Sequence, residues 1–202
     1  MKLSQIDFSL FQTINQLCPS HPILSLVMKF LSLYGAYILY LGIVVYWFSG
    51  TKKNRQMVLQ ALLSACVALG ISGVIGHFFY RPRPFATHDV IQLIDHANNA
   101  SFPSNHATGA LVIAVSFWLF RKKMSWAWLL LALGIAFSRV WVGVHYPGDV
   151  LVGSILGTLT ALTVHYLLPK VKFMYQTMNE ILSFATKVEN GILTMNSKNK
   201  SS

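Results

Sequence analysis

Three short polar segments of the sequence contain residue types that suit phosphate chemistry. They are Arg81-Pro82-Arg83-Pro84, then Phe102-Pro103-Ser104-Asn105-His106, and finally Ser138-Arg139 with His145 and Asp149 downstream. An arginine side chain is a permanently charged, planar group that can bind two phosphate oxygens at once. A histidine can act as a nucleophile or as a general acid and base, and a neighbouring carboxylate fixes its tautomer. These segments indicate phosphoryl chemistry if the fold brings them together.

Each of these residues also has a simpler interpretation when it is taken alone. Arg83 could anchor a helix at a membrane surface, and Arg139, near the end of an apolar helix, could form an internal salt bridge with Asp149. Ser104 predicts a helix start, where its side chain would cap the helix and free backbone N–H groups would face an anion. Asp149 could serve as a helix cap and nothing more, and His145 could be an ordinary loop residue. For all of these simpler interpretations to be correct together, three polar clusters would have to lie at one membrane face by chance.

Five long apolar segments must position these clusters. They run approximately over residues 21–48, 57–79, 106–120, 126–144 and 150–168. The chain is 54% hydrophobic and only 11% charged, whereas a soluble domain has about 25% charged residues. Stretches of about 20 apolar residues are long enough to cross a bilayer, although the third segment is short. The sequence predicts an all-α, multi-pass membrane helix bundle with about five spanning helices, and it excludes disorder as the main state.

The basic residues between these segments predict the topology of the bundle. Most lysines and arginines follow the first, third and fifth segments: Lys52, Lys53, Arg55, Arg121, Lys122, Lys123, Lys170, Lys172, Lys187, Lys198 and Lys200. The loops at the opposite side, 80–103 and 145–148, contain no lysine. Cytoplasmic loops are enriched in Lys and Arg, so the three polar clusters are expected on the non-cytoplasmic face. This topology accounts for the net charge of +10 without a nucleic-acid partner.

The chain is expected to have three parts. Residues 1–20 form an amphipathic helix, with apolar residues at Ile6, Leu10, Ile14 and Leu17, that either lies at the membrane surface or packs on its own bundle. They do not resemble a secretory signal. Residues 21–169 form the membrane domain, and residues 170–202 form a cytoplasmic tail whose polar end is predicted to be disordered. Cys18 and Cys66 do not indicate a disulfide framework or a zinc site.

The ordered motifs resemble the signature blocks of the type-2 phosphatidic acid phosphatase superfamily. The matching residues are Arg83-Pro84, Pro103-Ser104-Asn105-His106, and Ser138-Arg139 with His145 and Asp149. Within that superfamily, the membrane composition and the stretch Phe79-Tyr80-Arg81-Pro82-Arg83-Pro84-Phe85 are most similar to bacterial undecaprenyl-diphosphate phosphatases of the bacitracin-resistance type. The resemblance implies a cell-membrane enzyme that hydrolyses an isoprenoid lipid diphosphate at the outer face and supports recycling of the cell-wall lipid carrier.

The resemblance also implies roles for individual residues. His145 would attack phosphorus and form a phosphohistidine, Asp149 would orient His145, and His106 would protonate the leaving oxygen and later activate water. The groups that would hold the phosphoryl oxygens are Arg83, Arg139, Ser104 and the backbone of Asn105. No metal or other cofactor is implied.

The sequence departs from the family pattern at two positions. The family lysine that lies seven residues before Arg83 is Gly76 here, and Arg81 or His77 could supply the missing charge. Asn105 stands where the family commonly has glycine, and asparagine tolerates left-handed backbone better than most residues.

Three alternatives remain open at this stage. The lipid could be phosphatidylglycerol phosphate or phosphatidate, because tail recognition relies on generic apolar grooves. A metal-dependent hydrolase could use His88, Asp89, Asp95 and His96, although their spacing matches no recognisable ligand pattern. A lipid or ion transporter could line a path with the arginines and histidines, although these polar residues gather at one face. The sequence does not predict an oligomeric state.

Overall fold

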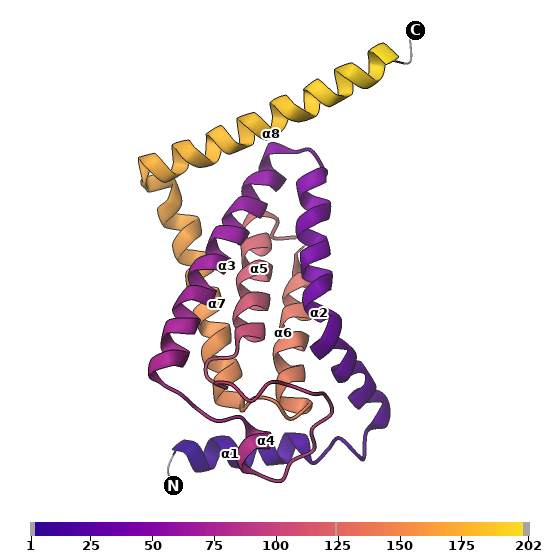
Figure 1. Cartoon of the computed structure of the whole chain (residues 1–202), viewed down its shortest axis with the longest axis vertical. Coiled ribbons are helices and arrows are strands. Elements are labelled where there is room, and N and C mark those ends of the chain that lie inside the picture. The colour runs from indigo at the N-terminus through magenta and orange to yellow at the C-terminus, as the bar shows by residue number, and fades with distance from the viewer. Residues whose placement is uncertain (1–2, 124, 200–202) are drawn as a thin grey trace.

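The computed structural model describes residues 3–123 and 125–199, and over these ranges the chain is helical with no strand. In chain order the helices are α1 (Leu3–Asn15), α2 (Pro22–Phe48), α3 (Lys52–Phe78), α4 (Pro84–Thr87), α5 (Asn105–Phe120), α6 (Trp126–Trp141), α7 (Pro147–Leu167), η1 (Leu168–Lys170) and α8 (Lys172–Asn199). Helices α2, α3, α5, α6 and α7 run along the long axis, whereas α1 crosses one end and α8 crosses the other (Figure 1). The predicted all-α membrane bundle is confirmed.

The five axial helices correspond to the five predicted apolar segments, and local chemistry explains where their ends differ. Helix α3 begins five residues earlier than expected because Thr51 caps it, its side chain accepting a hydrogen bond from the Asn54 N–H at 3.2 Å. Helix α6 ends at Trp141 because Gly143 takes a positive φ of 85°. A side chain at Gly143 would also clash, since its Cβ would lie 2.4 Å from the Ile91 carbonyl oxygen. His145 follows directly after this turn.

Helix α5 forms the centre of the bundle. It packs against α3, α6 and α7, and most of its side chains are buried. Gly157 lets α7 approach α5 closely, because a Cβ there would lie 2.4 Å from the Thr108 carbonyl oxygen. Within the described residues, three helical stretches, α2, α3 and α7 with η1, are long and apolar enough to cross a membrane, whereas α5 and α6 are apolar but have 16 residues each. The short third segment is therefore the core helix.

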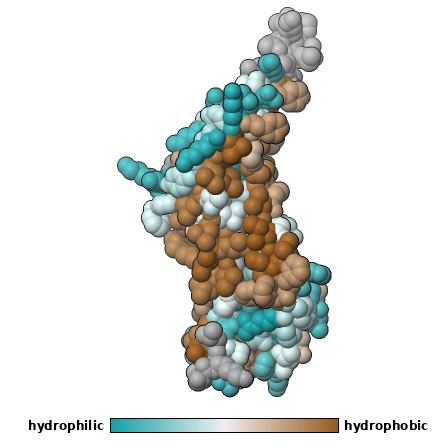
Figure 2. Space-filling model, turned by 90° about the vertical axis from the view of Figure 1, so that its left-hand side faces the viewer, coloured by the Kyte–Doolittle hydropathy of each residue, from teal (hydrophilic) through white to brown (hydrophobic). Residues whose placement is uncertain are grey.

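The surface has an apolar belt between two polar ends (Figure 2). The predicted basic loops, which join α2 to α3, α5 to α6 and α7 to α8, all lie at the end crossed by α8 (Figure 1). The loops that contain the phosphate-chemistry motifs lie at the opposite end, beside α1. The charge segregation expected from the sequence is thus present in the fold.

Helix α1 packs on the bundle, which was one of the two possibilities for the N-terminal residues. The Phe11 side chain is fully buried against Val140 and Tyr146. The Asn15 side chain donates to the Ile91 and Trp141 carbonyl oxygens at 2.9 Å and 3.0 Å. The helix ends at Asn15, earlier than predicted, and turns follow it.

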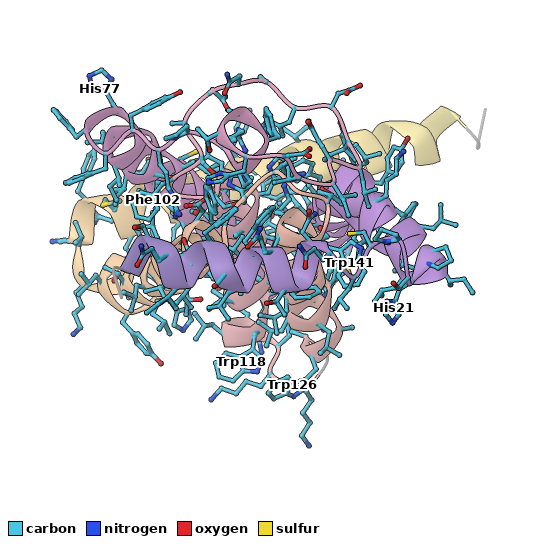
Figure 3. All side chains as sticks on the ribbon, turned by 90° about the horizontal axis from the view of Figure 1, so that it is seen from below. His21, His77, Phe102, Trp118, Trp126 and Trp141 are labelled. Carbon is cyan, nitrogen blue, oxygen red and sulfur yellow. The ribbon has the colours of Figure 1, made fainter. Side chains whose placement is uncertain are left out.

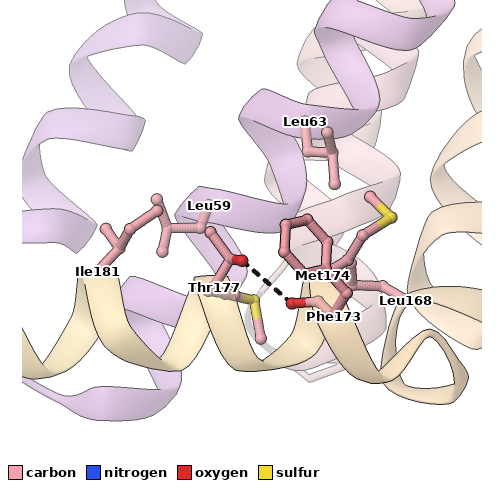
Figure 4. A pocket seen from close by; sticks show the side chains of 8 residues that line it. Leu59, Leu63, Leu168, Phe173, Met174, Thr177 and Ile181 are labelled. Carbon is pink, nitrogen blue, oxygen red and sulfur yellow. Dashed lines mark hydrogen bonds between the residues drawn. The ribbon is translucent and has the colours of Figure 1, made fainter.

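The expectation of a disordered end to the tail is wrong over the described residues, because α8 continues to Asn199. Its first turns bury Met178 and Leu182 with Leu168 against Leu59 and Leu63 of α3. Figure 4 shows the apolar pocket between these helices, which has a volume of about 300 Å³. Tertiary packing of this apolar face stabilises a helix that composition alone did not indicate. Residues 200–202 lie outside the described part of the chain.

Candidate active site

The three predicted polar clusters meet at the end of the bundle that α1 crosses. Arg83 immediately precedes α4, Ser104 immediately precedes α5, and Arg139 lies in the last turn of α6. His145 lies in the turn between α6 and α7, and Asp149 lies in the first turn of α7. The Arg83 Nη1 atom is 3.1 Å from the His145 Nε2 atom. Residues more than sixty positions apart thus share one site.

His145 and Asp149 form a buried pair. The His145 Nδ1 atom lies 3.6 Å from Asp149 Oδ2, and the Ser101 hydroxyl lies between them, 3.3 Å from Nδ1 and 2.5 Å from Oδ2. The Tyr146 backbone N–H also donates to Asp149 Oδ2 at 2.9 Å. Asp149 therefore caps α7 and faces His145 at the same time, so the two interpretations of this residue do not exclude each other.

The contacts of His145 define its tautomer. A guanidinium group has only N–H donors, so the short contact with Arg83 requires a lone pair on His145 Nε2. The proton of the neutral ring then lies on Nδ1, toward Asp149 and Ser101. Burial lowers the pKa of His145 to about 4, against the opposing effect of the hydrogen bond to Asp149 and with a further lowering by the charges of Arg83 and Arg139. His145 is therefore neutral at neutral pH, with an unprotonated Nε2 that could act as a nucleophile once its contact with Arg83 is released.

Arg83 is held in place by the loop that precedes α5. Its Nε and Nη2 atoms donate to the Asn99 side-chain oxygen at 3.1 Å and 2.8 Å, and Nη2 also donates to the Ala100 carbonyl at 3.3 Å. Its Nη1 atom donates to the Val144 carbonyl at 2.9 Å. These contacts direct the guanidinium edge toward His145. The side chain is only 4% exposed, and this burial lowers the pKa of Arg83 from its ordinary value.

Arg139 has donors that no described residue satisfies. Its Nη1 atom donates to the Ser32 hydroxyl at 2.6 Å and to the Ser32 carbonyl at 3.1 Å. Its Nε and Nη2 atoms are buried without a hydrogen-bond partner among the described residues, and so is the motif hydroxyl Ser104 Oγ. Buried polar groups without partners are costly. Asp149 pairs with Arg81 and not with Arg139, so the predicted alternative of an Arg139–Asp149 salt bridge is not what the structure contains.

The second motif forms the start of α5, as predicted, but not with the predicted cap. Ser104 occupies the cap position, yet its side chain makes no capping hydrogen bond, and its backbone N–H donates to the Asp149 carbonyl at 3.0 Å. Asn105 is the first helical residue, and no described residue other than glycine has a positive φ, so its tolerance of left-handed backbone is not used. The half-buried His106 lies in the same turn, within electrostatic range of Arg139 and His145.

The position of the missing family lysine is tightly packed. A Cβ at Gly76 would lie 3.0 Å from the Phe102 carbonyl oxygen. His77 lies at the outer edge of α3 and points away from the bundle (Figure 3). Arg81 lies at the site, but its Nη1 atom donates to Asp149 Oδ1 at 2.8 Å and to Asp7 Oδ2 at 2.7 Å. Neither candidate extends a free charge toward Arg83 and His145.

Sequence reasoning missed several residues of the site: Asp7, Ser32, Asn99 and Ser101. No motif or spacing identified them, because each meets its partner only through the tertiary fold. His96 was considered only as a metal ligand, whereas its ring lies 6.3 Å from that of His145. His88 instead stacks on Phe8 at 3.9 Å. The described ranges contain no group of three or more His, Cys, Asp or Glu residues that could hold a metal ion.

Comparison with known proteins gives a consistent result. The model of the PAP2 superfamily matches residues 57–173. The chain is 42% identical, over all of its length and 97% of the relative's, to the Bacitracin transport permease protein BcrC of Bacillus licheniformis. It is 34% identical to Undecaprenyl-diphosphatase BcrC of Bacillus subtilis (strain 168), over 90% of this chain and 96% of that one. Among solved structures, the PAP2-type phosphatidylglycerolphosphate phosphatase of Bacillus subtilis matches with a TM-score of 0.64 at 26% identity, covering 84% of this chain and 87% of that one.

Proposed function

The chain belongs to the PAP2 superfamily, and we propose that it is a membrane phosphatase that hydrolyses undecaprenyl diphosphate to undecaprenyl phosphate. This reaction would return the lipid carrier of cell-wall synthesis to its monophosphate form and would support bacitracin resistance. The names of two BcrC relatives, which cover nearly the whole chain, support this substrate.

The observation that carries the proposal is the set of unsatisfied donors among the motif residues at this end of the bundle. The Nε and Nη2 atoms of Arg139 and the hydroxyl of Ser104 are buried without partners among the described residues, and Arg83 adds a second guanidinium beside the His145 ring. A terminal phosphoryl group has three oxygens that accept hydrogen bonds and a negative charge that two arginines would offset. The site is therefore suited to an anion of this size and charge.

The geometry supports a two-step reaction with a covalent intermediate. In the first step the Nε2 lone pair of His145 attacks the terminal phosphorus and the bond to the bridging oxygen breaks. His106, in the protonated form that the negative charge of the bound diphosphate favours, donates its proton to that oxygen as undecaprenyl phosphate leaves. In the second step His106 removes a proton from water, which attacks the phosphohistidine and releases orthophosphate. Asp149 stabilises the positive charge that develops on His145. Arg83, Arg139 and Ser104 stabilise the phosphoryl oxygens in both transition states.

The position of the site favours a lipid substrate at the outer face of a bacterial cell membrane. The basic loops occupy the end opposite the site, and the side with such loops is normally cytoplasmic. The apolar belt gives way to a polar surface at each end of the molecule (Figure 2), and the loops that hold the site belong to one of these ends, near the depth expected for lipid phosphate groups.

A second candidate keeps the reaction and changes the lipid to phosphatidylglycerol phosphate or phosphatidate. The structural similarity to a phosphatidylglycerolphosphate phosphatase favours this candidate, although the BcrC relatives are more similar in sequence. The transporter alternative has weaker support, even though one relative is called a transport permease, because the polar clusters gather at one end of the bundle. Turnover of a panel of purified lipid phosphates separates the two lipid classes.

The experiment that tests the proposed function measures orthophosphate released from undecaprenyl diphosphate by the purified, detergent-solubilised protein, with and without EDTA. The proposal predicts release at equal rates in both conditions. A protein that transports lipid without cleaving it would release no orthophosphate, and complete loss with EDTA that a divalent ion restores would favour metal-dependent hydrolysis. Either of these results would contradict the proposal.

A further inference from the structure

Helix α1 contributes a charged residue to the active-site end of the bundle. Asp7 and Arg81 form an ion pair that reaches the buried carboxylate of Asp149. We propose that Asp7 and Arg81 are positioning residues that hold Asp149 in its orientation toward His145. This assignment rests on the proposed function and extends it to the N-terminal helix.

Arg81 holds one oxygen of Asp149 while other groups hold the second. The Arg81 Nη1 atom donates to Asp149 Oδ1 at 2.8 Å. The Oδ2 atom receives the Ser101 hydroxyl at 2.5 Å and the Tyr146 N–H at 2.9 Å, and it faces His145. The Asp149 side chain is fully buried, and a buried carboxylate without a cationic partner is strongly disfavoured. Arg81 therefore both stabilises this charge and prevents the carboxylate from rotating.

Asp7 completes this arrangement from α1. Its Oδ2 atom accepts from Arg81 Nη1 at 2.7 Å, and its Oδ1 atom accepts from the Gly148 N–H at 2.8 Å. A negative charge at the start of a helix is stabilised by the helix dipole, and Gly148 lies in the first turn of α7, next to Asp149. The Asp7 carboxylate thus binds the backbone that carries Asp149 and the arginine that pairs with it.

The position of Asp7 is itself fixed by the packing of α1. Phe11, one turn further along, is fully buried, and Asn15 makes hydrogen bonds to the backbone of Ile91 and Trp141. Figure 3 shows α1 lying across the site end of the bundle. The helix therefore presents Asp7 to Arg81 from a fixed place.

The charge balance explains why both residues are needed. Arg81 alone would draw the negative charge of Asp149 away from His145, and this would weaken the support for positive charge on the attacking imidazole. Asp7 offsets part of the Arg81 charge through the same Nη1 atom. Without Arg81, in contrast, the Asp7 and Asp149 carboxylates would face each other without a cation between them.

The contacts of Arg81 also differ from those of the proposed phosphate-binding arginine. Its guanidinium lies 3.7 Å from the centre of the Tyr146 ring, and its Nη1 atom donates to two carboxylates. Arg139, in contrast, has two buried nitrogens without a partner among the described residues. Arg81 is thus placed to orient Asp149 and not to replace the missing family lysine.

The test compares Asp7→Asn, Arg81→Gln and the double variant with wild type and with Asp89→Asn, which removes the same charge from an exposed loop residue at the same end. A displaced catalytic group can slow a reaction on the order of a hundredfold. We therefore expect kcat for undecaprenyl diphosphate to fall about a hundredfold in Arg81→Gln and about tenfold in Asp7→Asn. KM should stay near the wild-type value. The double variant should lose less than the product of the two single losses, because the residues act together.

Anion binding provides a second measurement that does not depend on the lipid. Inorganic vanadate mimics the five-coordinate transition state and inorganic phosphate mimics the ground state. In Asp7→Asn and Arg81→Gln the affinity for vanadate should fall in parallel with kcat, while the affinity for phosphate should not change. In a variant that only folds less well, a smaller fraction of the protein would bind anions. That fraction would bind both vanadate and phosphate with wild-type affinity.

The possible results have different consequences for the two proposals. Wild-type kcat and vanadate affinity in Asp7→Asn, or a raised KM with unchanged kcat in Arg81→Gln, would overturn the positioning assignment and leave the proposed function intact. A wild-type protein that releases no orthophosphate and binds neither anion would contradict the proposed function and, with it, the positioning assignment.

Discussion

The Nε2 atom of His145 lies 3.1 Å from the Nη1 atom of Arg83. Since Arg83 can only donate, the Nε2 lone pair of His145 accepts this hydrogen bond, and a phosphoryl group bound by Arg83 would lie beside it. The opposite ring nitrogen faces Asp149 and Ser101. The imidazole is therefore fixed from both sides in the tautomer that nucleophilic attack needs, before any substrate is bound.

Substitution of the proposed nucleophile should abolish turnover. In His145→Ala the attacking lone pair is lost, so orthophosphate release from undecaprenyl diphosphate should fall to the background rate. His77→Ala is the matched control, because His77 lies at the same end of the bundle but points away from it (Figure 3). Normal turnover by His145→Ala would refute the proposed role, and a large loss in His77→Ala would restore His77 as a replacement for the missing lysine.

Replacement of Arg139 by lysine, which keeps the positive charge, should also lower kcat. A lysine ammonium is a point charge and cannot supply both the bond to Ser32 and the paired donors at Nε and Nη2. Loss of one donor to a transition-state oxygen costs on the order of 10²-fold in kcat, and we expect Arg139→Lys to lose about that much. Arg121→Lys, at the opposite end of the bundle, serves as the control. Equal kcat values for Arg139→Lys and wild type would contradict phosphate binding by the Arg139 fork.

Ser101 should contribute through the His145–Asp149 pair. Its hydroxyl contacts both residues, and a hydrogen bond to a charged group contributes about 1.5–3 kcal/mol. We expect kcat to fall at least about tenfold in Ser101→Ala, since a tenfold loss in rate corresponds to about 1.4 kcal/mol, with little change in KM. Ser116→Ala removes another buried serine hydroxyl, which bonds only within α5, and should leave kcat unchanged. Equal kcat values for Ser101→Ala and Ser116→Ala would contradict the bridging role of Ser101.

The buried environment of His145 predicts an unusual titration. Burial lowers its pKa to about 4 from an ordinary value of 6.5, so the neutral ring should persist in the folded protein down to about pH 4. Between these values the unfolded chain binds more protons at this site, so His145 should lower the stability of the fold as the pH falls from 6.5 toward 4. An NMR titration of histidine-labelled protein, with His145→Ala to assign the signal, measures the midpoint. A midpoint near 6.5 would contradict the proposed burial and contacts.

The long helices could be predicted from the sequence because their signal is local. The length of the apolar segments predicted the five axial helices, and the basic residues predicted which loops lie at the same end of the bundle. Helix α8 was missed because its stability comes from Met178 and Leu182 packing on Leu59 and Leu63, which composition does not reveal. Helix α4, Pro84–Thr87, is a single short turn inside a loop and has no periodic pattern.

The site residues with motif spacing could be found from the sequence, whereas their supporting contacts could not. Arg83, Ser104, Arg139 and His145 belong to ordered blocks. The fold brings Arg83 into contact with His145, Arg139 within electrostatic range of His145, and the Ser104 N–H onto the Asp149 carbonyl. Asp7 is separated from Gly148 by most of the chain, and no local pattern marks it as a partner of the site. The place of Arg81 between two carboxylates likewise depends on how α1 docks.

Trapping the covalent intermediate would show directly whether His145 is the nucleophile. Undecaprenyl diphosphate labelled with ³²P in its terminal phosphate is mixed with the protein, turnover is stopped in alkali, and labelled peptides are identified by mass spectrometry. The proposed mechanism predicts an acid-labile label on the peptide that contains His145, and none in His145→Ala. Label on another residue, or steady release of orthophosphate without any labelled protein, would contradict it.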